Sequence, residues 1–198
     1  MTELNDKQIK KLLSQMLDDY RYNHSICVAD EAKRLAEKYG ADSQKAYFAG
    51  LVHDITKNYS REEHLKIFDN FGIILSDVEK NSDKLWHAMS GSVYIKEYLG
   101  VNDNDIVSAV RYHTTAKSDM TLLEKVIYVA DFTSSDRNYP DVDVMRQLSD
   151  KSLEEAMIYA LKYTIDELID RDAVMHPDTL CAYNFLISNN NSKGEVLV

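Results

Sequence analysis

The chain of 198 residues has only two prolines, six glycines and two cysteines. So few glycines and prolines leave little of the turn chemistry that a β-sandwich or a β-barrel requires. Cys27 and Cys181 show neither CxxC nor zinc-ribbon spacing, which favours two reduced thiols over a disulfide or a cysteine-based zinc site. No stretch approaches the roughly 18 uninterrupted apolar residues of a membrane-spanning helix. These absences disfavour several classes of protein at once.

Positive charge is also scarce, because 23 Lys and Arg residues face 33 Asp and Glu residues, giving a formal net charge of −10. Nucleic-acid affinity comes largely from clustered cations, so we expect no nucleic-acid partner. A small phosphorylated substrate stays compatible if a few cations gather locally. The N-terminus, Met1–Asp6, lacks the basic and apolar regions of a signal peptide. We therefore predict a cytoplasmic protein with no membrane partner.

Apolar residues recur at helical spacing along most of the chain, and no strand-like alternation competes with that pattern. The hydrophobic share of 44% and the charged share of 28% are ordinary for a globular protein. We see no internal repeat and no linker. The sequence predicts a single all-α domain, a helical bundle of about nine helices over residues 1–188. Residues 189–198 are predicted to form a flexible C-terminal tail.

One histidine-aspartate doublet, His53-Asp54, follows an apolar run and precedes the polar Thr56-Lys57-Asn58. Neighbouring side chains on a helix point about 100° apart, so both can converge on one ion only near a helix end. The polar residues predict such an end. A doublet by itself is weak evidence for a site, and the interpretation depends on other polar groups that face inward.

Further polar residues continue the apolar stripes of their predicted helices. An inward histidine taken alone is ordinarily a hydrogen-bonded core residue, but an unpaired buried carboxylate is costly and needs a partner. The inward polar set is His24, His53, Asp54, His87, His113 and Asp131. A bound metal would neutralise the aspartates and give the imidazoles a partner. Mixed nitrogen and oxygen ligands suit iron(II), manganese, cobalt, nickel or zinc better than magnesium or calcium.

This spacing on helices resembles the HD-domain superfamily of metal-dependent phosphohydrolases. More closely, the chain resembles the YqeK-type HD family, the symmetrical dinucleoside tetraphosphate hydrolases of bacteria, from about residue 20 to about residue 184. The motifs that carry this resemblance are Ala49–Lys57, Arg111–Thr115, Leu122–Asp131, Arg137 with Tyr139-Pro140, His176-Pro177 and Tyr183-Asn184. The combination is considerably more specific than the doublet alone.

The resemblance implies roles for particular residues. The implied metal ligands are His24, His53, Asp54 and Asp131, and the implied catalytic residues are Asp54, His87 and His113. Substrate binding falls to Arg21, Lys57, His87, His113, Thr114 and Arg137. His87 and His113 would either hold a second metal ion or contact phosphate oxygens, and a solvated surface role is the alternative for each cation. Iron is the preferred cofactor, with manganese, cobalt, nickel and zinc as alternatives, as one or two ions.

The implied reaction is symmetrical cleavage of diadenosine tetraphosphate to two ADP by a metal-activated water, in a homodimer. Two alternatives stay open: another HD-type hydrolysis, of deoxynucleotides or of a guanosine tetraphosphate alarmone, and a non-catalytic HD interaction scaffold. The sequence departs from the family pattern at two places. Ser134-Ser135 stands where the family tends to have Glu-Pro, so we expect the loop that presents Arg137 to be more mobile. Ala116 stands where the family usually has glycine.

Overall fold

The computed structural model describes residues 5–194, with side chains described through residue 190. Within this range the chain forms α-helices, one short 3₁₀ helix and no strand, which confirms the predicted all-α class. The elements are α1 (Asp6–Met16), α2 (Asp19–Tyr39), α3 (Ser43–Val52), α4 (Arg61–Asn70), α5 (Asp77–Lys80), η1 (Asp83–Leu85), α6 (Trp86–Glu97), α7 (Asn104–Tyr112), α8 (Leu122–Thr133), α9 (Val142–Lys151), α10 (Leu153–Asp170) and α11 (Pro177–Gly194).

The eleven α-helices found between residues 5 and 194 exceed the predicted number of about nine. The four-residue helix α5 is too short for apolar periodicity to reveal. Its local signal is a capping box between Ser76 and Glu79, and equivalent boxes open α4 and α8. Helix α11 also continues through residues 189–194, where the sequence predicts a flexible tail, while residues 195–198 lie outside the described range. The domain limit at residue 188 stays a prediction.

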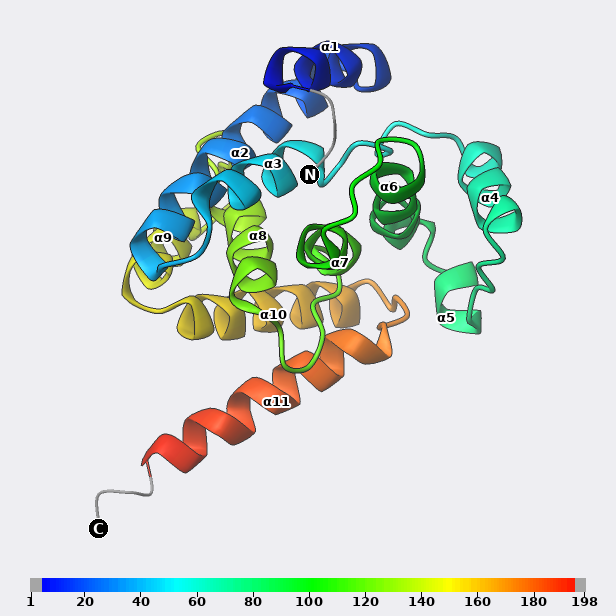
Figure 1. The fold of residues 1–198 in the computed structure, drawn as a ribbon. Coiled ribbons are helices and arrows are strands. Elements are labelled where there is room, and N and C mark those ends of the chain that lie inside the picture. The colour runs from blue at the N-terminus through cyan, green and yellow to red at the C-terminus, as the bar shows by residue number, and fades with distance from the viewer. Residues whose placement is uncertain (1–4, 195–198) are drawn as a thin grey trace.

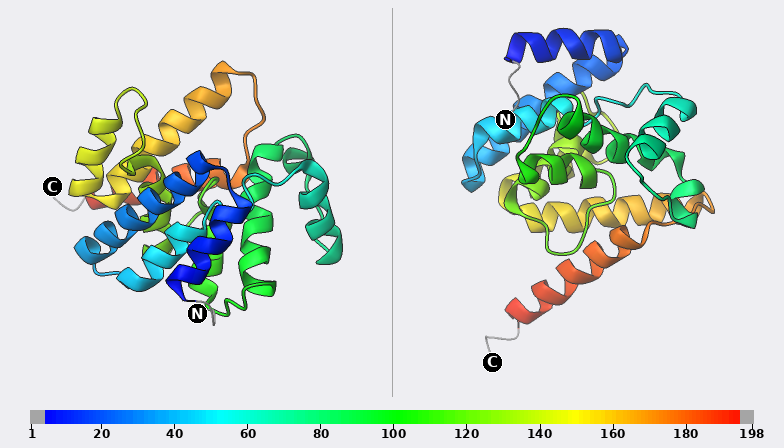
Figure 2. Two further views of the ribbon diagram at one scale, coloured as in Figure 1. Left: turned by 90° about the horizontal axis from the view of Figure 1, so that it is seen from above. Right: turned by 45° about the vertical axis from the view of Figure 1, so that its right-hand side comes forward.

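Helices α2, α3, α7 and α8 form the centre of the bundle (Figure 1). Helix α2 packs against α3 and α8, and α7 packs against α3, α6 and α8. Helix α10 lies beneath α8 and contacts α9 and α11, while α4 and α5 stand at the side of α6 (Figures 1 and 2). None of the helices in the described range has both the length and the apolar character needed to cross a membrane.

A glycine brings α2 and α3 into close contact. A Cβ atom on Gly50 would lie 2.9 Å from the Cα atom of Ala29 and 3.0 Å from the carbonyl oxygen of Val28. Both of those atoms belong to the α2 backbone and cannot rotate away, so only glycine fits at this crossing. The close approach matters for the site, because α2 carries His24 and the chain leaving α3 carries His53.

Ala116 adopts a left-handed backbone conformation with φ 55° and is fully buried. This conformation costs an L-residue roughly 1–2 kcal/mol and costs glycine little. The strain gives a physical reason for the glycine that the resembling family usually has at this position. Here the alanine methyl group compensates in part by packing in the main core cluster.

Candidate metal centre

The six inward polar residues predicted from the sequence meet at one place between α2, α3, α6, α7 and α8. Helix α3 ends at Val52 and the chain turns through residues 53–58, so the predicted helix end at the doublet is confirmed. His113 directly follows the end of α7, His87 lies in the first turn of α6, and Asp131 lies in the last turn of α8. Among the side chains that the structure describes, two overlapping groups could hold a metal ion: His24, His53 and Asp131, and His53, Asp54 and His113.

His53 presents one unprotonated ring nitrogen to this centre. Its Nδ1–H group donates to the carbonyl oxygen of Gly50 at 2.7 Å, which leaves Nε2 with a lone pair. The Nε2 atom is buried and has no hydrogen-bond partner. Burial lowers the pKa of His53 to about 3, although the charges of Asp54 and Asp131 act in the opposite direction. A neutral imidazole with a free, buried lone pair is the form that ligates metals.

His113 is oriented in the same way. Its Nδ1–H group donates to the carbonyl oxygen of Val110 at 2.7 Å, and its Nε2 atom lies 3.5 Å from Oδ1 of Asp54. The two rings of His53 and His113 meet edge to face with centroids 4.9 Å apart. In both histidines a backbone carbonyl therefore selects the tautomer that directs Nε2 toward the same carboxylate.

Asp54 is 2% exposed, and its Oδ1 atom has no hydrogen bond of acceptable geometry. Its Oδ2 atom accepts a hydrogen bond from Nη1 of Arg21 at 3.2 Å, and Nζ of Lys57 lies 3.5 Å from Oδ1. Burial alone would raise the pKa of Asp54, but the neighbouring His53, Lys57 and His87 hold it well below its usual value. The carboxylate is therefore ionised, and its buried Oδ1 atom makes no hydrogen bond.

These observations test whether a divalent metal fits the site. His53 Nε2 and Asp54 Oδ1 are buried in one cluster and make no hydrogen bond, so each would otherwise carry the free-energy cost of an unsatisfied polar atom. The donor set of imidazole nitrogens and carboxylate oxygens is the set that first-row transition metals accept. In His53 and in His113, the tautomer that the backbone carbonyl selects leaves Nε2 free to bind a metal. These residues therefore fit a divalent metal ion.

His24 lies at the Asp131 end of the cluster. Its Nε2 atom is 2.9 Å from Oδ1 of Asp131, and its Nδ1 atom is 2.8 Å from Oδ2 of Asp136. Burial would lower the pKa of His24, but the two carboxylates outweigh it and raise the pKa to about 9. Arg137 donates through Nε to the carbonyl oxygen of Asp131 at 2.7 Å and pairs with its carboxylate. Asp136 is a residue that the sequence analysis missed, and it holds the nitrogen of His24 that would not bind metal.

His87 joins the cluster to an adjacent cavity. Its Nε2 atom lies 3.1 Å from Oδ1 of Asp54, and Nζ of Lys57 lies 3.0 Å from the same nitrogen. Burial and the charge of Lys57 lower the pKa of His87 to about 4, so the ring is neutral near pH 7. The hydroxyl of Thr56 donates to the carbonyl oxygen of His87 at 2.9 Å and fixes the start of α6. Lys57 therefore stands between the buried carboxylate and the cavity.

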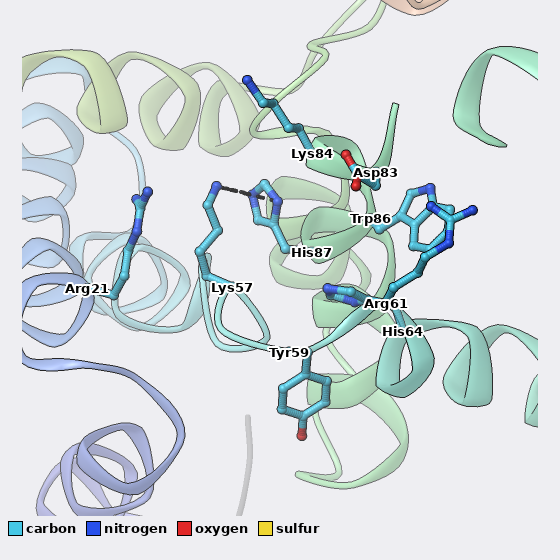
Figure 3. A pocket seen from close by; sticks show the side chains of 9 residues that line it. All are labelled: Arg21, Lys57, Tyr59, Arg61, His64, Asp83, Lys84, Trp86 and His87. Carbon is cyan, nitrogen blue, oxygen red and sulfur yellow. Dashed lines mark hydrogen bonds between the residues drawn. The ribbon is translucent and has the colours of Figure 1, made fainter. Parts of the chain in front are cut away.

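The cavity has a volume of about 480 Å³ and is shown in Figure 3. Arg21, Lys57 and His87 stand in a row along it, and Arg61 lies across Trp86 at the far end. The lining contains four cations and one carboxylate, in a protein with ten more acidic than basic residues. The lining residues are Arg21, Lys57, Tyr59, Arg61, His64, Asp83, Lys84, Trp86 and His87. Such a local excess of positive charge favours an anionic ligand.

The structure brings three of the four cationic or hydroxyl candidates, Arg21, Lys57 and Arg137, to the edge of the metal centre. Thr114 differs, because its hydroxyl is buried without a hydrogen-bond partner and does not line this cavity. Its role in substrate binding stays a prediction. Arg61 and Lys84 were missed, since nothing in the helical pattern separates them from solvated surface cations.

Comparison with known proteins identifies the fold family. The family model described as HD domain matches residues 21–136, more than half of the chain. The chain belongs to the HD-domain family. A symmetrical bis(5'-nucleosyl)-tetraphosphatase of Bacillus subtilis is 38% identical to this HD domain over 187 residues, covering 94% of the chain and 100% of the relative. A protein of the same name from Staphylococcus aureus is 31% identical, covering 92% and 94%.

A solved structure agrees with this assignment. The crystal structure of a predicted HD superfamily hydrolase involved in NAD metabolism from Clostridium acetobutylicum superimposes on this HD domain with a TM-score of 0.91. The two sequences are 36% identical, and the match covers 94% of this chain and 98% of the other. The resemblance stated from the sequence motifs is confirmed.

Proposed function

We propose that this HD domain is a metal-dependent hydrolase that cleaves dinucleoside tetraphosphates symmetrically, converting diadenosine tetraphosphate to two ADP. The observation that carries the proposal is the buried pair of atoms His53 Nε2 and Asp54 Oδ1, neither of which makes a hydrogen bond, beside a cavity lined by four cations. The two buried atoms provide a metal site, and the cavity provides a site for a polyanion. The names of the relatives from Bacillus subtilis, Halalkalibacterium halodurans and Staphylococcus aureus supply the substrate.

The residues that would hold the metal are His24, His53, Asp54 and Asp131, with iron preferred. When bound, a divalent ion supplies Lewis acidity and lowers the pKa of a coordinated water from about 15.7 toward 7. His113 is the natural candidate for a second ion, since it shares Asp54 with His53 in one of the two ligand groups. Iron as the metal and the number of ions stay predictions.

The protein's own side chains bind and align the polyphosphate. Lys57 and Arg21 lie at the cavity mouth of the metal centre and neutralise phosphate charge, and Arg137 does so at the Asp131 end. His87, held neutral beside Lys57, donates its ring N–H group to a phosphate oxygen and adds no charge. In the reaction a water oxygen bonds to one central phosphorus, the central P–O–P bond breaks, and the bridging oxygen leaves with the second ADP.

The first test is product analysis on protein reloaded separately with iron(II) and manganese. We expect ADP as the only nucleotide product from diadenosine tetraphosphate, with turnover abolished by a chelator. The variants H53A and D54A should lose both metal content and hydrolysis, whereas D77A, which removes a carboxylate that is 94% exposed, should keep both. Release of AMP and ATP would contradict central cleavage. Turnover of deoxynucleotides or guanosine tetraphosphate alone would favour another HD-type hydrolysis. No turnover of any nucleotide with a filled metal site would favour the non-catalytic scaffold.

The cytoplasmic location and the homodimer also belong to this proposal. The homodimer would be tested by sedimentation equilibrium on the metal-loaded protein, and a monomer at micromolar concentration would contradict it. The location would be tested by fractionating cells that express the tagged protein.

A further inference from the structure

We propose that the metal centre lies between two nucleoside subsites, one at each end of the ligand cluster, and that together they recognise both halves of the substrate. This inference rests on the proposed function. The Trp86 hollow is the cavity described above, and its nucleoside-facing residue is Arg61. The Tyr163 hollow is a second cavity, of about 250 Å³, lined by Asp131, Phe132, Arg137, Tyr139 and Tyr163.

The order of the ligands places the two hollows at opposite ends. Nε2 of His53 lies 3.7 Å from Oδ2 of Asp54 and 3.9 Å from Oδ1 of Asp131, so His53 stands between the two carboxylates. The Trp86 hollow reaches the Asp54 end through Lys57 and His87. The Tyr163 hollow reaches the other end directly, because Asp131 is part of its lining. A polyphosphate that crosses the cluster therefore enters a hollow at each side.

The Trp86 hollow combines cations for phosphate with a flat surface for a base. The guanidinium group of Arg61 lies over the Trp86 ring, with its carbon 4.5 Å from the ring centroid. Trp86 is fully buried, whereas the Arg61 side chain that lies over it is exposed (Figure 3). Guanidinium planes stack on nucleobases, and an aromatic ring behind the guanidinium holds it flat. Lys57 and Lys84 line the same hollow and provide positive charge for the phosphates.

The Tyr163 hollow repeats the same combination with different residues. Arg137 stands beside Asp131 as the phosphate-binding cation. The rings of Tyr139 and Tyr163 lie with centroids 5.6 Å apart and planes tilted by 36°. The hydroxyl of Tyr139 donates to the carbonyl oxygen of Phe132 at 2.9 Å, which fixes that ring, and Tyr163 is 38% exposed and offers an open aromatic face. Base stacking on such a face tolerates any nucleobase.

Two stacking surfaces at fixed positions account for symmetrical recognition in a way that one cannot. A single nucleoside subsite would hold one half of the substrate and leave the other half in solvent. Surfaces at both ends bind both nucleosides, and the length of the phosphate chain between them then decides which bond lies at the metal centre. The hollows differ in chemistry, guanidinium on one side and tyrosine on the other, so each can be removed separately.

The experiment uses metal-loaded protein, two substrates and the variants R61A, Y163A and the double variant. Diadenosine tetraphosphate needs both subsites, so each single variant should raise its KM roughly 5- to 150-fold, the range expected for losing one base stack. Adenosine 5'-tetraphosphate carries one nucleoside and can bind in either direction, yielding ADP and pyrophosphate both ways. Its KM should change less than about 3-fold in the single variants and by the full factor only in the double variant.

Three controls separate stacking from other causes. R61K keeps the charge but removes the planar group, and it should behave as R61A does. Y98A removes an exposed tyrosine outside both hollows and should leave both KM values unchanged. Metal content and the melting temperature are measured for every variant and should match those of the wild type. An unchanged KM for diadenosine tetraphosphate in either single variant overturns the proposal, and so does an equal loss for both substrates in one single variant. If the wild type cleaves neither substrate, the proposed function itself fails.

Discussion

Replacing Gly50 by alanine tests the packing that places His24 next to His53. The added Cβ atom would lie 2.9 Å, 3.0 Å and 3.1 Å from three backbone atoms of α2. Carbon atoms prefer separations of about 3.5–4.0 Å, so the helices must separate by roughly half an ångström or more. No side-chain rotation relieves these contacts. The perturbation therefore acts on the distance between α2 and α3.

The expected magnitude follows from two opposing effects. Alanine is favoured over glycine in a helix by about 1 kcal/mol. Overpacking a well-filled contact costs about 1–3 kcal/mol, and more where only backbone atoms can yield. We expect a net loss near 2 kcal/mol, which lowers Tm by about 4–8 °C for a chain of this size. The displacement also separates His24 from His53, whose ring centroids lie 5.3 Å apart, so metal content should fall.

The matched control is G91A, the same substitution in the middle of α6. A Cβ atom there would lie 3.4 Å from Oγ1 of Thr56 and 3.6 Å from Cγ1 of Val110, which is ordinary contact. We expect G91A to raise Tm by about 2 °C through helix propensity alone. The assays are thermal unfolding followed by circular dichroism and metal content measured by atomic emission after dialysis. A G50A protein as stable and as fully loaded as G91A would refute the reasoning.

Three further predictions follow from the site. D136A removes the acceptor of the Nδ1–H group of His24, so metal affinity should fall about 10- to 100-fold in a competitive chelator titration. An unchanged affinity would show that the contact with Asp136 is not needed to orient the His24 ring. Removing the metal should lower Tm by about 5–10 °C if the ion is held at 100 times its Kd, and equal melting of apo and loaded protein would argue against the buried site. K57M should reduce kcat/KM about 10²- to 10³-fold while metal content is kept; loss of metal instead would make Lys57 structural.

The sequence predicts well which polar residues meet in the cluster, because each of them lies on an element with a strong local signal. His24 and Asp131 continue the apolar stripes of α2 and α8, and the structure buries His24 completely. The polar residues that follow the doublet predict the helix end after Val52, and this end lets His53 and Asp54 point to one centre. Periodicity reports which side chains face inward, and an inward histidine or aspartate is informative because its burial demands a partner.

The residues that the sequence analysis missed lack such a signal. Asp136 lies in the loop after α8, where no period exists, and its contact with His24 joins positions 112 residues apart. Arg61 is the first residue of α4 and looks like any exposed helix-start cation. Its role arises from Trp86, which begins a different helix, α6, and approaches only in three dimensions. Contacts between elements that are distant in sequence decide both cases, and one sequence does not contain that information.

The loop that presents Arg137 shows how tertiary contacts replace a missing local constraint. Without the Glu-Pro step of the resembling family, the sequence predicts greater mobility, since proline restricts the backbone and serine does not. In the structure Arg146, on α9, donates to the carbonyl oxygens of Ser134 at 3.0 Å and Arg137 at 2.9 Å. The amide of Arg137 also donates to the Ser134 carbonyl at 3.0 Å. A guanidinium group that bridges two carbonyls fixes the loop from outside, so the placement of Arg137 depends on how α9 packs against α8.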